Sequence, residues 1–470
     1  MAALETEPPA LAAASQSPVS HSKDPFVGNV SKISPHHGGS SKQSYKKGNL
    51  IFDACFEGGN LGRVDLINDF EYDLFIRPDT CNPRFRMWFN FTVSNVKSDQ
   101  RVIFNIVNFS KTKSLYREGM SPLVKSTSRP HWQRIPSKAV FYYRCPDHQK
   151  NYVLSFAFAF DKEEDMYQFS YSFPYSFTRL QKLLDKLEMK GLDYFQRETI
   201  CKTVQQRPLD LLTITHPRNL DPSSRARMVF ITARVHPGES PASYVCQGLM
   251  EHLMSDTLEG ELLRENIIFK IVPMLNPDGV YLGNYRSSLM GFDLNRHWAD
   301  PSPWAQPTIT ATKKLVMEYD QDPNIDLDFY IDIHSHSIHT NGFMYGNVYD
   351  EEERFERQAV FPKLLAKHAT DFSWNKTSFN RDAIKAGTGR RYLGDCLSPQ
   401  THCYTLMYPL TTHSPSLWVH RYLGDCLSPQ THCYTLMYPP TTHSPSLWVH
   451  RYLGDCLSPQ THCYTLMYPH

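Results

Sequence analysis

The chain contains no long apolar run: in 470 residues, none approaches the length needed to cross a lipid bilayer. The first residues, MAALETEPPALAAAS, also lack the basic stretch and the continuous apolar stretch of a secretory signal peptide. We therefore expect an intracellular, cytoplasmic protein that does not insert into a membrane.

An excess of charge is absent too. The 49 Lys and Arg residues nearly balance the 48 Asp and Glu residues, which leaves a net charge of +1. This balance gives no general attraction to nucleic acid, so no nucleic-acid partner is expected. Paired cysteines are also missing, because six of the eleven cysteines lie in a C-terminal repeat and the other five are irregularly spaced. Reduced thiols are the simplest account.

Composition and periodicity divide the chain into segments. Residues 1–47 are rich in Ser, Pro, Lys and Gly, which predicts a disordered tail. Residues 48–173 show short runs of alternating apolar and polar side chains, such as 85–93, which predict an antiparallel β-sandwich domain. At residue 174 the period changes: Leu180, Leu183, Leu184 and Leu187 have helical spacing, and Ser176 or Thr178 can cap the helix.

Strand and helix patterns then alternate, which predicts an α/β domain with a mixed sheet over residues 174–410. The expected strands are 209–215, 228–235, 267–273 and 327–334, and the expected helices are 242–255, 308–319 and 350–370.

The segment Val235-His-Pro-Gly-Glu-Ser240 follows one of the apolar strands. Pro237 and Gly238 end the strand, so His236 and Glu239 are expected on a strand-to-helix turn, where ligands bind in open α/β sheets. An imidazole nitrogen and a carboxylate oxygen can bind one zinc ion from such a turn. Taken alone, the four-residue pattern favours a plain turn with a surface Glu over a metal site.

A third zinc ligand can come from the segment DFYIDIHSHS, where an apolar strand ends at His334. Its position matches that of His236, so both can face one crevice. His336 is an alternative, but His334 lies nearer the rigid strand. Three protein ligands with one position left for water is the arrangement of a catalytic zinc site.

Two further motifs carry polar side chains that suit such a site. Asn276-Pro-Asp-Gly279 is a turn by composition, followed by Arg286 in NYR, and DLNRHW contains Asn295 and Arg296. An arginine near zinc can stabilise an oxyanion, and an Asn-Arg pair can hold a carboxylate.

The motifs HPGES, NPDG with NYR, DLNRHW and DIHSHS, in that order, resemble the cytosolic carboxypeptidases, a branch of the funnelin metallocarboxypeptidases that trim glutamates from proteins such as tubulin. The resemblance covers residues 50–393 and is closest to the branch of cytosolic carboxypeptidase-like protein five. It implies a carboxypeptidase-like fold, one Zn2+ per chain, polyglutamylated tails such as those of tubulin as partners, and a cytoplasmic location that extends to microtubules and the nucleus.

The resemblance also implies roles for individual residues. His236, Glu239 and His334 would bind zinc, Arg286 would stabilise the oxyanion, and Asn295 with Arg296 would hold the terminal carboxylate of the substrate. The segment AGTGRR lies where the family lines its side-chain pocket, so Arg390 or Arg391 would pair with a glutamate side chain.

One family residue is missing. The family places a general-base Glu in a strand of YTLE type, whereas this chain reads Cys403-Tyr-Thr-Leu-Met407. A thioether cannot accept a proton at neutral pH, so the resemblance implies an enzyme without its base. Two hypotheses follow: a zinc deglutamylase with severely reduced turnover, or a non-catalytic protein that binds glutamate-rich tails.

The C-terminal part is repetitive. The segment 391–420 recurs as 421–450 with one change, Leu410 to Pro440, and again from 451 in a shortened copy. Because the first copy overlaps the enzyme-like domain, we interpret the repeats as a duplication rather than a solenoid, and expect them to be poorly ordered. The carboxypeptidase-like domain is accordingly expected to be incomplete at its C-terminal side.

Overall fold

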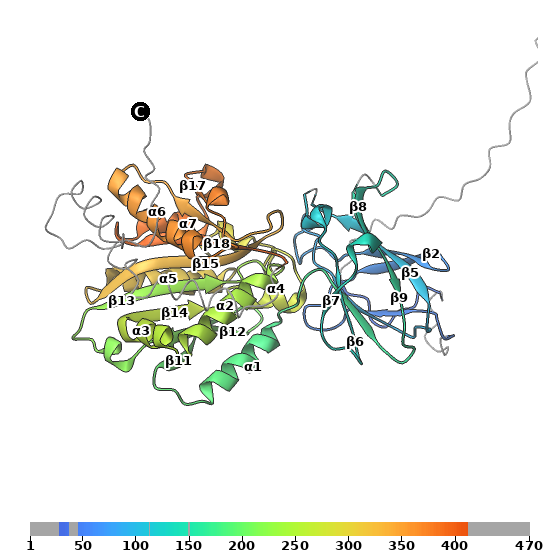
Figure 1. The fold of residues 1–470 in the computed structure, drawn as a ribbon, viewed down its shortest axis with the longest axis horizontal. Coiled ribbons are helices and arrows are strands. Elements are labelled where there is room, and N and C mark those ends of the chain that lie inside the picture. The colour runs from blue at the N-terminus through green and yellow to red at the C-terminus, as the bar shows by residue number, and fades with distance from the viewer. Residues whose placement is uncertain (1–27, 37–45, 112, 149–150, 412–470) are drawn as a thin grey trace, which may run out of the picture.

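The computed structural model describes residues 28–36, 46–111, 113–148 and 151–411. They form two domains, a β-domain and an α/β domain, that lie side by side (Figure 1). Among these residues, no helix is both long enough and apolar enough to span a membrane.

The β-domain consists of two five-stranded sheets around one core. Aromatic side chains from both sheets fill the space between them; the rings of Phe91 and Phe104, one from each sheet, are 6.1 Å apart. The first sheet has the order β1 (Ile51–Asp53), β4 (Asn90–Ser94), β10 (Tyr167–Ser170), β6 (Leu123–Ser126) and β7 (Gln133–Arg134). The second has the order β2 (Arg63–Asn68), β3 (Glu71–Phe75), β5 (Arg101–Phe109), β9 (Tyr152–Ala159) and β8 (Val140–Arg144).

One pair of strands differs from the expected antiparallel pattern. Strands β3 and β5 are parallel, with Tyr72 opposite Phe104. Between them the chain crosses to the other sheet as β4, so it returns beside β3 in the same direction. The alternating pattern predicts strands but not this crossover.

Part of the expected N-terminal tail is ordered against the β-domain, which corrects that prediction for residues 28–36. Ile33 and Phe52 exchange backbone hydrogen bonds of 2.8 and 2.9 Å, and Val30 is buried in the core. These contacts add an edge segment to β1, whose own span is too short to cover the core. The rest of the segment expected to be disordered, residues 1–27 and 37–45, lies outside the described residues.

The α/β domain contains one mixed sheet, as predicted, and this sheet has eight strands. Its order is β11 (Phe195–Lys202), β12 (Pro208–Ile214), β14 (Ile267–Val272), β13 (Ala226–Ala233), β15 (Ile325–His336), β18 (His402–Pro409), β16 (Phe343–Asn347) and β17 (Ser378–Asn380). The central strands β14, β13, β15 and β18 run parallel, which brings their C-terminal ends to one edge of the sheet.

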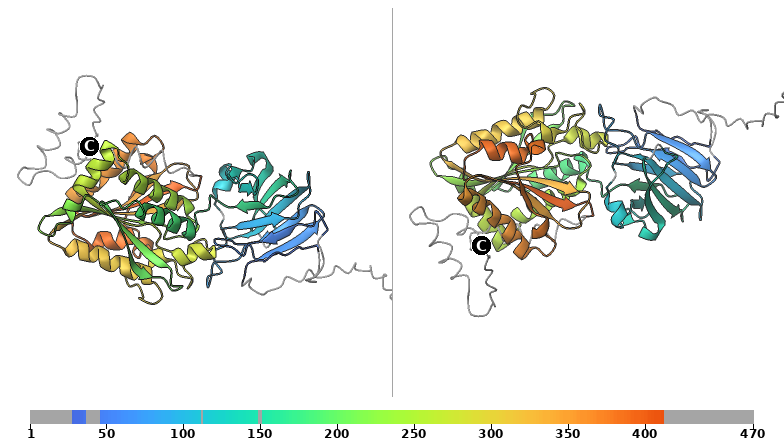
Figure 2. Two further views of the ribbon diagram at one scale, coloured as in Figure 1. Left: turned by 90° about the horizontal axis from the view of Figure 1, so that it is seen from below. Right: turned by 90° about the horizontal axis from the view of Figure 1, so that it is seen from above.

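Helices cover both faces of this sheet, as the edge-on views show (Figure 2). Buried leucine, valine and aromatic side chains of four helices pack on one face, and those of two others pack on the opposite face. The first group is α1 (Phe177–Glu188), α2 (Ser240–Leu253), α3 (Leu258–Asn266) and α6 (Glu352–His368), and the second is α5 (Pro307–Gln321) and α7 (Gly389–Cys396).

The expectation that the repeats are poorly ordered is wrong for residues 391–411. They complete α7 and form β18, which lies inside the sheet between β15 and β16. Cys403, Tyr404 and Leu406 are fully buried there, so this stretch is held by strand pairing and by the core. The remaining repeats, residues 412–470, lie outside the described residues.

Candidate metal and substrate site

The turn that carries His236 and Glu239 is held by a buried arginine. Strand β13 ends at Ala233, and Arg234 then adopts a left-handed backbone conformation with a φ of 59°. Its guanidinium donates to the carbonyl oxygen of Pro237 from Nε and Nη2, at 2.9 and 2.7 Å. The side chain therefore ties the two ends of the turn together, a role that the sequence pattern does not reveal.

Gly238 is required in this turn because Tyr285 packs directly against it. A Cβ atom at position 238 would lie 2.5 Å from the Tyr285 ring and 2.8 Å from its carbonyl oxygen. The Gly238 amide donates to that same carbonyl oxygen at 2.7 Å. The HPGES turn is thereby fixed to the loop that carries Arg286.

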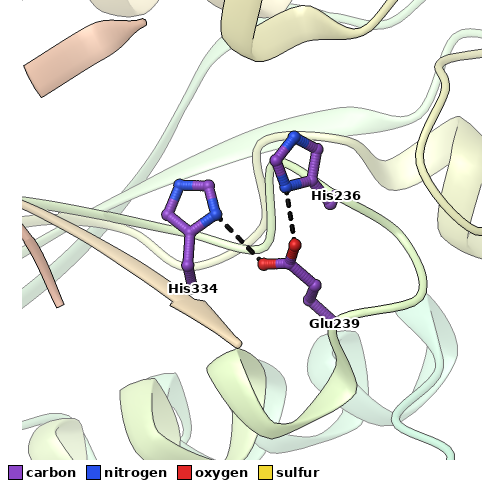
Figure 3. A group of neighbouring side chains, drawn as sticks. All are labelled: His236, Glu239 and His334. Atoms are coloured by element: carbon purple, nitrogen blue, oxygen red, sulfur yellow. Dashed lines mark hydrogen bonds and ion pairs between the residues drawn. The ribbon is translucent and has the colours of Figure 1, made fainter. Parts of the chain in front are cut away.

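His236, Glu239 and His334 come together as one group (Figure 3). The Glu239 carboxylate lies between the two rings: Oε1 is 2.8 Å from Nδ1 of His236, and Oε2 is 3.0 Å from Nδ1 of His334. One potential ligand atom from each residue lies within 4.8 Å of the others. Burial raises the pKa of the Glu239 carboxyl, but the two imidazoles lower it by more, so that it stays well below its usual range.

Two further carboxylates orient the imidazoles. Asp293 Oδ1 lies 3.1 Å from Nε2 of His236, and Asp332 Oδ2 lies 2.6 Å from Nε2 of His334. Metal-binding histidines characteristically have such a carboxylate on the second ring nitrogen. The donor set of two imidazoles and a carboxylate, backed by two more carboxylates, therefore fits Zn2+.

Both aspartates lie within motifs that the sequence reveals, but the sequence does not indicate a role for them. The signal that could have identified them is their spacing: Asp332 lies two residues before His334 on one strand, and so on the same face. Asp293 had no comparable signal, because it reaches His236 from a loop 57 residues away.

His336, the alternative third ligand, is placed differently. It is absent from the group that can hold a metal; its ring stacks on His339 with centroids 4.8 Å apart, and its Nδ1 accepts from the Ile338 amide. Burial lowers the pKa of His336 to about 4. The geometry thus favours His334.

Arg286 lies beside the candidate metal ligands. Its Nε donates to Asp293 Oδ2 at 2.7 Å, and its guanidinium lies 5.9 Å from the ring centroid of Phe85 in the β-domain. Burial lowers the pKa of Arg286, but Asp293 raises it by more, so the guanidinium remains charged.

The backbone on both sides of Arg286 is held by the β-domain. The buried Asp79 carboxylate accepts from the amides of Tyr285, Arg286 and Ser287 at 2.6, 2.8 and 2.7 Å. Sequence reasoning missed Asp79, since nothing local marks a contact across more than 200 residues.

Asn295 and Arg296 follow Asp293 in a short 3-10 helix, which Asp293 caps by accepting from the Asn295 amide. Asn295 Nδ2 lies 3.2 Å from His334 Nε2, and Asn295 Oδ1 accepts from the Gly389 amide at 3.0 Å. The Arg296 guanidinium donates to the Asn295 carbonyl oxygen at 2.6 Å.

The two arginines considered for the side-chain pocket have different surroundings. Arg390 lines the same cavity as the residues above, and its side chain is almost fully buried. Arg391 does not line that cavity; it pairs with Asp395 one helical turn later, at 3.2 Å. Of the two candidates, only Arg390 faces the site.

Met407 also faces the site. It lies on β18 directly opposite His334 on β15, and its side chain lines the cavity. The cavity has a volume of about 410 Å3 and, besides the residues already described, is lined by Lys111, Tyr285, Ser335, Ser337, Ile338, Tyr345, Asn380, Asp382, Lys385, Thr388 and Thr405.

The arrangement can do three things chemically. The group of His236, Glu239 and His334 can hold zinc, which when bound supplies Lewis-acid catalysis. The five cations on the cavity wall can bind carboxylates, and their charge outweighs the two acidic groups there. The residue at position 407 cannot transfer a proton, because methionine has no titratable group.

Two family models match the chain, one for each domain. Residues 52–171 match the cytosolic carboxypeptidase N-terminal domain, and residues 180–414 match zinc carboxypeptidase. The boundary between the two matches falls where the β-domain ends and α1 begins.

Curated relatives extend this result. Cytosolic carboxypeptidase 6 of Mus musculus is 65% identical over 82% of this chain and 71% of its own length. The human protein of that name is also 65% identical, and the Caenorhabditis elegans protein is 48% identical over 81% of each chain. The predicted proximity to protein five was therefore wrong, because four short motifs around the site carry too few positions to distinguish members of the family.

Solved structures support the fold. A metallocarboxypeptidase from Burkholderia cenocepacia superposes with a TM-score of 0.66 at 21% identity, covering 80% of this chain and 96% of that one. One from Pseudomonas aeruginosa superposes with a TM-score of 0.64 at 23% identity, covering 82% and 98%. Since sequence similarity runs through both domains and the fold agrees over most of the described chain, the protein belongs to the cytosolic carboxypeptidases, a family of zinc metallocarboxypeptidases.

Proposed function

We propose that this protein binds the glutamate-rich C-terminal tails of cytoplasmic proteins, tubulin among them, and that it releases C-terminal or branch-point glutamates from them only very slowly. Microtubules and the nucleus are the places where such tails would be met. The assigned roles are zinc binding by His236, Glu239 and His334, oxyanion stabilisation by Arg286, recognition of the terminal carboxylate by Asn295 and Arg296, and recognition of the side-chain carboxylate by Arg390.

The choice of glutamate rests on one observation: the buried Arg390 is charged but has only neutral partners. Its guanidinium donates to neutral acceptors only: the Gly346 carbonyl oxygen, Asn347 Oδ1 at 2.5 Å and Asn380 Oδ1 at 3.1 Å. Among the described residues, no carboxylate lies within ion-pair distance of it. A buried cation without a counter-ion is costly, and burial lowers its pKa to about 10. A substrate carboxylate would supply the missing charge.

The neighbouring groups support the same substrate. Lys111, Lys385 and Arg296 face the cavity along with Arg286 and Arg390. A free C-terminal glutamate carries two carboxylates, one on the backbone and one on the side chain. Asn295 and Arg296 lie beside the candidate metal ligands, whereas Arg390 is held by β16 and β17. Two separate cationic groups thus match two carboxylates.

Slow turnover is inferred from Met407. The strand position opposite His334 lies at the cavity wall, where a carboxylate could take a proton from water and pass it to the leaving amine. Methionine cannot do so, and loss of a general base typically lowers the rate by roughly 10²–10⁴-fold. If the residual rate is zero, the protein is a pure binder of acidic tails, which is the second candidate function.

The test restores the base. Met407→Glu should raise the rate of glutamate release from a polyglutamylated peptide by roughly 10²–10⁴-fold. Met407→Gln, which has a similar size but cannot accept the proton, serves as the matched control and should leave the rate unchanged. Adding His236→Ala to Met407→Glu should abolish the gain, because it removes a zinc ligand.

Two results would contradict the proposal. Release by the native chain as fast as by Met407→Glu would show that position 407 does not carry the base. Failure of the zinc-loaded native chain to bind a glutamate peptide at low ionic strength would reject both the enzyme and the binder.

A further inference from the structure

A second cavity, of about 590 Å3, lies in the β-domain. Four of the residues that line it are cationic, and none is acidic. Its walls come from the loop before β4, the end of β5 and the strands β8 and β9, and they include Arg84, Arg86, Phe109, Lys111, Arg144 and Tyr152.

This basic cavity is adjacent to the metal site. Lys111 lines both cavities, and its Nζ donates to Ser337 Oγ at 2.6 Å and to Tyr285 Oη at 3.1 Å. Phe85, which lies between two of the cationic residues in the sequence, faces the Arg286 guanidinium at 5.9 Å. A ligand that leaves the metal site past Lys111 therefore meets the basic cavity next.

Two of the cations, Arg86 and Lys111, are held in place by neutral groups. Arg86 donates to the carbonyl oxygens of Asn108 and Pro83, at 2.9 and 2.5 Å. In the described part of the chain, no carboxylate forms an ion pair with Arg84, Arg86 or Lys111. A guanidinium fixed by carbonyl groups keeps its charge while losing little side-chain entropy on binding, so the cavity is preorganised for anions.

We propose that the basic cavity binds the acidic side chains that precede the terminal glutamate, so that the protein recognises a run of carboxylates rather than a single one. This inference rests on the proposed function, since it takes the C-terminal residue to lie in the metal site. The ligand class is an acidic peptide in extended form. Successive side chains on one face of such a peptide are about 7 Å apart, so several of them reach beyond the first cavity.

A peptide fits these observations better than a nucleic acid. The aromatic groups of the cavity are not displayed for base stacking: Phe109 is buried in the core, and the Tyr152 ring stacks on Tyr142. The cavity also shares Lys111 with a site whose geometry suits a chain terminus.

The test compares two peptides on the zinc-loaded full-length protein: diglutamate, which spans only the metal site, and a ten-residue polyglutamate. Dissociation constants measured by calorimetry at low salt should show tighter binding of the longer peptide. Arg84→Gln combined with Arg144→Gln should weaken binding of the ten-residue peptide roughly two- to thirtyfold and leave diglutamate binding unchanged.

The matched control is Arg101→Gln combined with Lys138→Gln. It removes the same charge from exposed positions of the same domain, outside the cavity. If it weakens binding of the longer peptide as much as the cavity variant does, the effect is one of net charge and the inference is rejected.

The remaining outcomes separate this inference from the proposed function. If diglutamate fails to bind the native protein, the proposed function itself fails. If diglutamate binds but the ten-residue peptide binds no more tightly, only the basic cavity is rejected. Tighter binding of a ten-nucleotide single-stranded DNA than of the peptide, lost in the cavity variant, would also overturn the inference.

Discussion

Arg390 and Arg391 show how much two adjacent residues of one type can differ in role. The first is buried among neutral acceptors at the wall of the metal-site cavity, and the second pairs with Asp395 on α7. Helix geometry turns consecutive side chains by about 100°, so only one of the two can face the site. Composition alone could not separate them.

Replacing Arg390 by Gln should abolish the preference for glutamate. A hydrogen bond to a charged partner contributes roughly 1.5–3 kcal/mol, so affinity for a peptide ending in Glu should fall about ten- to hundredfold. Affinity for the same peptide ending in Gln should change far less. Calorimetric titration with both peptides gives the two dissociation constants, and their ratio measures the preference for Glu.

Arg391→Gln is the matched control, and it should keep the preference. Since Arg390 also bonds to the Gly346 carbonyl oxygen and to Asn347, circular dichroism should first establish that the Arg390 variant is folded. A folded variant that still prefers Glu over Gln would remove Arg390 from the proposed function.

At the scale of elements, the sequence predicts the positions of those strands and helices that have a clear local periodicity. Both strands that carry candidate zinc ligands are recognisable as apolar runs: His236 follows the end of β13 at Ala233, and His334 lies just before the end of β15 at His336. Predicted strand and helix positions agree with β12, β13, β14, β15, α2, α5 and α6 to within a few residues.

What the sequence does not predict depends on contacts between distant segments. The place of β18 inside the sheet is decided by pairing with β15, about 70 residues away, and not by its own pattern. Residues 28–36 have the composition of a polar tail, and only their backbone pairing with Phe52 on β1 shows that they are ordered. The same holds for the carboxylates of Asp79 and Asp293, whose partners are far away in the chain.

Strand β18 should also make stability depend on pH through His402. Burial, together with the smaller effects of Arg357 and Arg354, lowers the pKa of this histidine to about 3. The unfolded chain binds a proton below about pH 6.5, whereas the folded protein does so only near pH 3. Stability is therefore lost as the pH falls from about 6.5 toward 3, by up to about 1.4 kcal/mol per pH unit.

Denaturant titrations at pH 7 and pH 5 test this effect. His402→Leu, which fills a similar volume without titrating, should reduce the loss of unfolding free energy between the two pH values. His368→Leu, at an exposed position near the end of α6, should not. If the native protein and His402→Leu lose the same unfolding free energy between pH 7 and pH 5, His402 does not contribute to the pH dependence of stability.

At the scale of the whole molecule, the two domains form one functional unit because the β-domain holds the loop that carries Arg286. Asn60 donates to the Gly283 carbonyl oxygen at 2.9 Å, and Arg77 to that of Leu282 at 2.5 Å. Asp79 accepts three consecutive amides of the same loop. The β-domain therefore positions a group of the metal site in addition to supplying the basic cavity.

Asp79→Ala tests this coupling. It leaves three buried amides without an acceptor, so the free energy of unfolding should fall by roughly 3 kcal/mol or more.

Below the unfolding temperature, the freed loop should no longer hold Arg286 in place, and the affinity for diglutamate should fall. Zinc affinity should fall less than the affinity for diglutamate, because Arg234 and Asp332 still hold the ligand residues, although Tyr285 and Asp293 link them to the freed loop. Asp79→Asn, which retains one carbonyl oxygen, should have an intermediate effect, and Asp65→Ala in a surface ion pair of the same domain should have almost none. If Asp79→Ala is destabilised but binds diglutamate like the native protein, the β-domain stabilises the fold without positioning Arg286.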